Sequence, residues 1–237
     1  MNFLHNPIPT TLNKDIENAI SIISSFIEPQ EVQATESIIP RDVLDTCSGI
    51  AVLTVVKGGI VWSARAGSGL VIAKLPDGKW SAPSAIGTAG FGFGGQIGAE
   101  ITDFVMLLRT PEAVKAFSRG GNVTLGTNIA IAAGPVGRNA EVSGSVLNTA
   151  PIYSYSKSKG LFVGISLEGS AIIERKDANS DFYGRKVSAT DILSGAVPQP
   201  SQAAALYSAI EKRSTNAKSA TSDSHPPTQN TSSNTQL

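Results

Sequence analysis

The sequence predicts an α+β domain, mostly antiparallel β-sheet, hairpin-rich and barrel- or sandwich-like, with an N-terminal amphipathic helix and short C-terminal helices. Three observations predict this class. β-Branched or alternating stretches recur between residues 50 and 174, glycines or prolines separate most of them, and an apolar stripe with helical spacing precedes them. A chain of 237 residues, 23 of them glycine, is long enough for one such domain with a sizeable core.

The first expected element is a helix over residues 12–27. Thr10 or Thr11 can cap its start, and Pro29 lies just beyond its end. Its polar face carries a single cation, Lys14. Its apolar residues recur at the spacing of one helical face: Leu12, Ile16, Ala19, Ile20, Ile23, Phe26 and Ile27.

Strands are expected where apolar residues alternate or are β-branched. Glycine-rich breaks at 58–59 and 67–69, and the turn composition of residues 76–79, predict that the first strands form antiparallel hairpins. The expected strands are 50–57, 60–66, 70–75, 102–108, 123–125, 128–133, 140–147, 152–157, 161–167 and 171–174.

Short helices are expected at 41–46, 110–117, 174–183, 189–193 and 202–213. Thr110-Pro111-Glu112 combines a capping side chain, a first-turn proline and an acid near the positive end of the helix dipole. Beyond residue 213 the chain is polar, with almost no apolar residue. We therefore expect one domain over residues 1–213 and a disordered tail over 214–237.

Charge and cysteine content narrow the class of protein. The 19 Lys and Arg residues balance 19 Asp and Glu residues, which disfavours a nucleic-acid partner held by phosphate contacts. The lone Cys47 cannot form an internal disulfide, which is typical of a reducing compartment. No apolar run approaches the roughly 20 residues that span a bilayer. We expect a cytoplasmic protein whose membrane contact, if any, is peripheral.

Residues 90–95 satisfy the G-x-G-x-x-G pattern, but the sequence predicts neither a strand before it nor a helix opening on its last glycine. Nucleotide binding is therefore not expected. Two alternatives remain for this run. It forms closely packed backbone, or it forms a lipid-facing loop that inserts Phe91 and Phe93.

Patterns that could carry catalysis lack the required context. Ser154 with Lys157, and Ser156 with Lys159, have the spacing of a serine–lysine dyad, but that geometry needs a helix and the segment predicts a strand. The two histidines lie near opposite ends of the chain. The carboxylates of residues 174, 177 and 181 share a predicted helix with two cations and fit a solvated face. We expect no catalytic residue, no metal and no cofactor.

Several motifs occur together along the chain, and none of them belongs to a catalytic constellation. They are Asn6-Pro7-Ile8-Pro9, Ile39-Pro40, Arg65-Ala66-Gly67-Ser68-Gly69, residues 80–86, Thr102-Asp103-Phe104-Val105, Leu125-Gly126, residues 133–138, residues 155–162 and Glu168-Gly169-Ser170. In this order they resemble the SYLF domain family over roughly residues 1–213, and in particular its fungal actin-patch, LAS seventeen-binding type.

The resemblance implies a non-enzymatic module that binds phosphoinositide-containing membranes and filamentous actin at endocytic or cortical actin patches. It also implies that the N-terminal helix contributes to lipid binding. Fungal relatives often end in an SH3 domain, whereas only a polar tail follows Arg213 here, so no SH3-mediated partner is expected from this chain.

Two sets of candidate binding residues follow. The lipid-binding candidates are Leu12, Lys14, Ile16, Ile20, Ile23, Phe91 and Phe93. The candidates for an anionic-partner patch are Lys157, Lys159, Arg175, Lys176, Arg185 and Lys186. Three alternatives stay open: packing of the helix on the sheet instead of on lipid, a purely structural protein-interaction domain, and a serine–lysine hydrolase.

Overall fold

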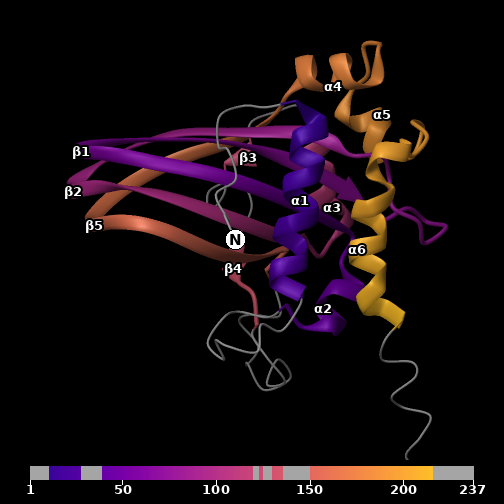
Figure 1. Cartoon of the computed structure of the whole chain (residues 1–237), viewed down its shortest axis with the longest axis horizontal. Coiled ribbons are helices and arrows are strands. Elements are labelled where there is room, and N and C mark those ends of the chain that lie inside the picture. Colours follow the sequence, from indigo (N-terminus) through magenta and orange to yellow (C-terminus); the bar gives the residue numbers. More distant parts are fainter. Residues whose placement is uncertain (1–10, 28–38, 120–122, 125–129, 136–149, 216–237) are drawn as a thin grey trace, which may run out of the picture.

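The fold is built from three long strands and a group of helices, as the computed structural model of the chain shows (Figure 1). The structure describes residues 11–27, 39–119, 123–124, 130–135 and 150–215. The long strands are β1 (Gly49–Ala73), β2 (Ser84–Leu108) and β5 (Ile152–Glu174), and β3 (Val123–Thr124) and β4 (Ile131–Ala133) are short. The helices are α1 (Leu12–Ile27), α2 (Arg41–Thr46), α3 (Pro111–Ser118), α4 (Lys176–Tyr183), α5 (Ala189–Leu193) and α6 (Ala204–Thr215), with a 3₁₀ turn at Ser201–Ala203.

The strands form one sheet in the order β1-β2-β5-β3, and β4 also pairs with β5. The β1–β2 and β2–β5 pairs are antiparallel along nearly their whole lengths. The mostly antiparallel α+β class predicted from the sequence is confirmed.

The strand β1 reverses direction near its middle. The N–H of Lys74 donates to the carbonyl of Ser48 at 2.8 Å, so the two ends of the strand lie side by side. The same holds further along, because Gly69 lies against the backbone of Val52 and Leu53. The reversal coincides with a register shift between Ile60 and Trp62, where Val61 has a φ of 62°. We call this end of the sheet the apex.

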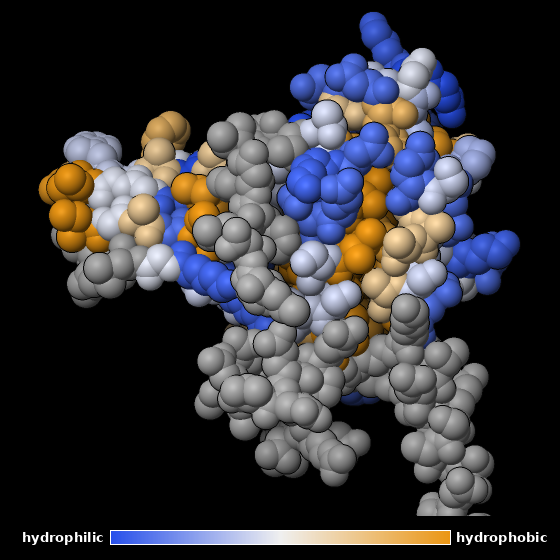
Figure 2. All heavy atoms as spheres, viewed as in Figure 1, coloured by the Kyte–Doolittle hydropathy of each residue, from blue (hydrophilic) through white to orange (hydrophobic). Residues whose placement is uncertain are grey.

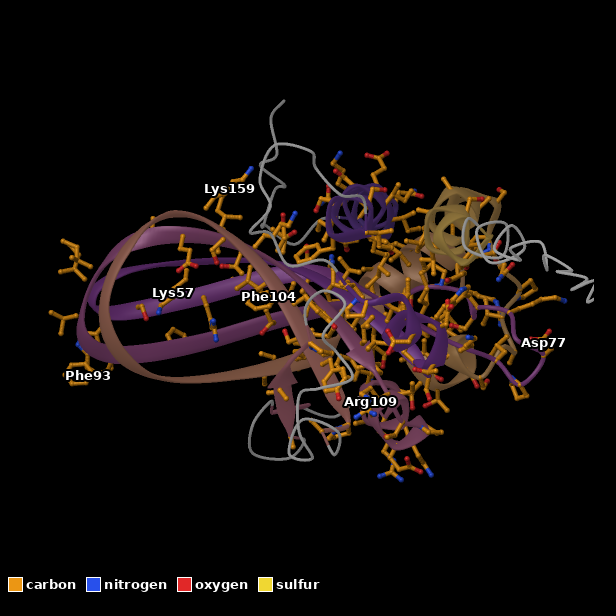
Figure 3. All side chains as sticks on the ribbon, turned by 90° about the horizontal axis from the view of Figure 1, so that it is seen from below. Lys57, Asp77, Phe93, Phe104, Arg109 and Lys159 are labelled. Atoms are coloured by element: carbon orange, nitrogen blue, oxygen red, sulfur yellow. The ribbon has the colours of Figure 1, made fainter. Side chains whose placement is uncertain are left out.

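Since β2 follows β1 in register and β5 follows β2, the three strands reverse together as arcs stacked side by side. In Figure 3, seen from below, β5 lies in front of the other two strands, with Phe93 at the far end of the arcs and Asp77 of the β1–β2 turn at the opposite end. Both ends of each arc therefore lie at one end of the molecule, which we call the base.

The predicted division of the sheet into short hairpins is wrong in detail. Segments 50–57, 60–66 and 70–75 form the single strand β1, and the three segments between residues 152 and 174 form β5. The reversal falls at the predicted Gly58-Gly59 break, whereas residues 67–69 continue the strand. The glycine run 90–95 is part of β2 rather than a loop. Glycines here let the ladder bend without ending it. The predicted strand at 140–147 lies outside the described residues.

The helices match their predicted positions closely. α1 and α2 span the predicted residues, and the Thr110 hydroxyl accepts the N–H of Ala113 at the start of α3. α4 begins two residues later than predicted because Glu174 still belongs to β5, and α4 ends at Gly184. α6 extends to Thr215, and residues 216–237 lie outside the described part of the chain, so the predicted tail stays a prediction.

The core lies at the base, on both faces of the arcs. Even-numbered β1 residues such as Ile50 and Ile72 pack with α1, α2 and α6, and odd-numbered residues such as Leu53 and Val71 pack with α3 and α5. Because both ends of every arc meet at the base, the helices gather there. Among the described residues none of the helices reaches the apex, which projects away from them in Figure 1.

The reversal of β1 predicts different tolerance at two adjacent glycines. A Cβ at Gly59 would clash with the backbone carbonyl of Trp62, whereas the nearest atom to a Cβ at Gly58 is 3.8 Å away. Gly59→Ala is expected to lower the free energy of unfolding by about 1–3 kcal/mol. Gly58→Ala is the matched control and is expected to be neutral or slightly stabilising. Urea unfolding measures both, and equal effects would contradict the tight reversal.

Candidate membrane and partner-binding surfaces

The apolar stripe of α1 faces the core. Leu12, Ile16 and Ile23 are buried, and Ile20 is partly buried against the same cluster. Lys14 is exposed and pairs with Glu17 at 2.7 Å. Of the two alternatives for this helix, the structure shows packing on the sheet. The lipid-facing assignment of Leu12, Ile16 and Ile23 is therefore corrected for the folded chain, because these side chains have no access to a membrane surface.

Sequence reasoning missed Asp15, which holds α1 in place. Its carboxylate is buried, forms an ion pair with the Arg175 guanidinium at 2.8 Å, and accepts the Ser68 hydroxyl at 3.0 Å. These partners come from the end of β5 and from β1. A signal was present in the sequence, since Asp15 is three residues after Leu12 and four before Ala19 and so falls inside the apolar stripe.

The six predicted patch cations do not form one surface. Arg175 is occupied by Asp15. Lys157 donates to the carbonyl of Ser25 at 2.8 Å and lies over the Phe26 ring at 5.0 Å, which ties it to α1. Lys159 is exposed further along β5 (Figure 3). The remaining three, Lys176, Arg185 and Lys186, are exposed at α4 and the turn after it.

Lys176 and Lys186 line an open pocket of about 480 Å³ between α4 and α5, together with Ser188, Asp177 and Asp191. The two carboxylates balance the two ammonium groups. The pocket therefore lacks the excess positive charge that would hold an anion strongly.

The three carboxylates predicted on one helical face are also separated. Glu174 accepts the N–H of Ala189 at 2.7 Å and the Asn179 amide at 3.3 Å, so it anchors the start of α5. Asp177 and Asp181 line a second pocket of about 310 Å³ beside Arg175. This arrangement serves local structure, and it places no pair of carboxylates in an enclosed site.

The serine–lysine spacings lie in a strand, as predicted. Ser154 with Lys157, and Ser156 with Lys159, are three residues apart in β5, so within each pair the side chains point to opposite faces. The Lys157 ammonium reaches Ser25 of α1 instead of Ser154. The dyad geometry that requires one helical turn is therefore not formed in β5.

Other reactive groups of the described chain are buried or scattered. Burial raises the pKa of the Cys47 thiol to about 12, and the thiol donates to the carbonyl of Leu44 at 3.1 Å, so Cys47 is not an activated nucleophile. Burial also raises the pKa values of Tyr155, Tyr183 and Tyr207. Within the described residues, no group of three or more His, Cys, Asp or Glu side chains is arranged to hold a metal ion. In the same part of the chain, no helix is long and apolar enough to cross a membrane.

Apolar side chains cluster at the apex. Phe91 and Phe93, named from the sequence, are 76% and 55% exposed, and Trp62 is 68% exposed. The Trp62 and Phe93 rings lie opposite each other in the β1–β2 ladder with centroids 4.6 Å apart. Figure 2 shows this end of the sheet as an apolar surface distant from the helices. We name these two phenylalanines, Trp62 and their exposed neighbours the apex cluster: Ile60, Val61, Trp62, Phe91, Phe93 and Ile97.

Four members of the apex cluster were not predicted from the sequence: Ile60, Val61, Trp62 and Ile97. Ile60, Val61 and Trp62 are consecutive apolar residues of a predicted strand, and only the shared register of β1 and β2 brings them together with Phe93 and Ile97. Contiguous exposed apolar surface of this kind is typical of interaction sites.

The strongly bent antiparallel sheet with helices at one end carries the motif order noted above, which resembles that of SYLF-type modules. Residues 89–213 match the Ysc84 family, described as Las17-binding protein actin regulator. The chain belongs to this family, which confirms the resemblance seen in the sequence.

Individual relatives match nearly the whole chain. LAS seventeen-binding protein 3 of Saccharomyces cerevisiae is 48% identical over 215 residues, covering 90% of this chain and 47% of that protein. An SH3 domain-containing protein of Schizosaccharomyces pombe is 49% identical, covering 89% and 49%. SH3 domain-containing YSC84-like protein 1 of Mus musculus is 50% identical, covering 86% and 60%. The chain thus spans about half the length of the curated yeast relatives it matches.

The buried ion pair of α1 predicts that replacing two acids of this helix, Asp15 and Glu17, lowers the stability of the protein to different extents. Asp15→Ala removes this ion pair from a mostly buried position, so we expect the free energy of unfolding to fall by about 3 kcal/mol or more. Glu17→Ala removes the exposed pair with Lys14 and is expected to cost less than about 0.5 kcal/mol. Chemical denaturation compares the two variants, and similar losses would show that Asp15 does not anchor α1.

Proposed function

We propose that this chain is a non-enzymatic module that binds phosphoinositide-containing membranes and filamentous actin, and that acts in endocytosis or cortical actin organisation. The observation that carries the proposal is the match of about 90% of the chain, at nearly half identity, to proteins named for LAS seventeen binding within a family described as actin regulators. On this proposal the protein is cytoplasmic and peripheral to the membrane.

The surfaces described above are consistent with binding rather than catalysis. Of the six predicted patch cations, the exposed ones are divided between Lys159 on β5 and the group at α4, and the apolar apex cluster lies at the other end of the molecule from α4 (Figure 1). Anionic partners such as lipid headgroups or the acidic surface of a filament attract such lysines with about 1 kcal/mol per cation near a surface. The proposal needs no cofactor.

Co-sedimentation of the full chain tests this function. We expect the protein to pellet with filamentous actin and, in a separate tube, with phosphatidylcholine vesicles that contain phosphoinositide. Binding should weaken from low to physiological salt because cations contribute. Pelleting with neither partner would overturn the proposal, and pelleting with actin alone would remove its membrane half.

A charge reversal identifies the contribution of β5. Lys159→Glu is expected to weaken vesicle binding by about tenfold, because it replaces an attraction with a repulsion. Lys79→Glu is the matched control, since Lys79 is equally exposed but lies in the turn at the base. Equal loss in both variants would indicate an effect of net charge rather than a defined surface.

A further inference from the structure

We propose that the apex cluster is the part of this protein that enters the membrane, inserting as a convex tip into the interfacial layer of the bilayer while α1 stays docked on the sheet. This inference rests on the membrane association proposed above and names the element responsible. It follows from the shape, depth, backbone pairing and residue types of the apex.

The depth of the apolar zone fits an interfacial insertion. The cluster extends from the reversal at Val61 to the level of the Ala64–Phe91 pair, three residues down one arm, and to the Ile60–Ile97 pair on the other arm. At a rise of about 3.3 Å per residue this is about 10 Å, which matches the depth to which interfacial elements bury their apolar side chains.

Cations begin immediately below this zone. Lys57 and Arg65 each lie four residues from Val61, one on each arm of β1, at about 13 Å from the tip, and Lys159 lies one pair further down than Lys57. Two acids accompany them in the register: Glu100 is the partner of Lys57, and Glu168 is the partner of Gly92, nearer the tip. Figure 3 shows Lys57 set back from Phe93 toward the helices. These three cations exceed the two acids by one near the level of the lipid phosphates.

The backbone of β2, the central strand of the apex, tolerates removal from water, whereas β1 is an edge strand of the sheet and keeps one backbone edge in the hydrated interfacial layer. β2 pairs with β1 on one side and with β5 on the other, and its glycine run at 94–95 still pairs with residues 165–166 of β5. Backbone groups that are already hydrogen-bonded enter an apolar layer without the large cost of unpaired N–H and C=O groups. A strand end without this pairing would carry unpaired N–H and C=O groups into the apolar layer, at a large cost in free energy.

Shape and residue type favour lipid over a second protein surface. All six side chains of the apex cluster are apolar and 46–76% exposed, so an apolar layer can cover the whole cluster without burying a charge. The cluster also curves around a reversal, so a rigid surface contacts only part of it, whereas fluid acyl chains surround it. Trp62 is the residue type that membrane–water interfaces favour.

The two tryptophans provide a direct test in the unmodified full chain. Trp62 is 68% exposed and Trp80 is 6% exposed. Aqueous iodide should therefore quench the fluorescence of Trp62 in the free protein, and it should not quench the fluorescence of Trp80. With vesicles of phosphatidylcholine, phosphatidylserine and phosphoinositide, we expect iodide quenching to fall and quenching by brominated phosphatidylcholine to appear. Vesicle-bound protein in which Trp62 stays open to iodide would overturn the inference.

A variant pair makes the same test through binding. Phe91→Ser combined with Phe93→Ser is expected to weaken vesicle binding by more than about tenfold, because two exposed aromatic anchors are lost. Actin pelleting should be unchanged. Ile173→Ser is the matched control, since Ile173 is 42% exposed on β5 outside the apex cluster. Wild-type binding by the double variant overturns the inference but leaves the proposed membrane function intact.

The remaining outcomes also decide the question. Wild-type protein that binds no vesicles overturns the inference together with the membrane half of the proposed function. A concentration-dependent dimer in analytical ultracentrifugation that the double variant abolishes would assign the apex to a second copy. Free monomer in which iodide cannot reach Trp62 would assign it to another segment of this chain. Each of these results contradicts insertion.

Discussion

The structure depends on the reversal of β1, because every later element follows from it. The strand turns back between Ile60 and Trp62, and β2 and β5 repeat the turn in register around it. Both ends of three long strands then lie at the base, and the helices that cover the sheet attach there. The apex is left with the paired backbone of β2 at its centre and with exposed side chains. The same geometry that builds the core on two faces therefore also creates an apolar surface remote from it.

The attachment of α1 is the second constraint. A helix with an apolar stripe can pack either on the sheet or on a membrane. Asp15 decides between these two partners. Its carboxylate is buried between Ser68 and Arg175, so release of α1 would break an ion pair and expose the stripe at once. In the folded chain the helix is a structural element, and the membrane contact that we propose lies at the apex, where the aromatic side chains are already exposed.

Local features were predictable from the sequence and long-range features were not. The bounds of α1 and α2 and the Thr110 cap of α3 depend on residues close together in the chain. The arcs do not, because Gly67-Ser68-Gly69 looks the same locally whether it ends a strand or lets the strand pass close to its own other half. Likewise the contact between Trp62 and Phe93 depends on how β1 and β2 pair, which the local sequence does not reveal. Arg175 is not part of a cationic surface because it pairs with Asp15, which is 160 residues away in the sequence.

The central claim is that the apex, and not α1, changes its environment on a membrane. Hydrogen–deuterium exchange of the full chain, with and without phosphoinositide-containing vesicles, tests it most directly. The account predicts slower exchange at residues 57–66 and 89–99 on vesicles, with exchange in residues 12–27 unchanged. Altered exchange across residues 12–27 with an unchanged apex would contradict it and would return the membrane contact to the N-terminal helix.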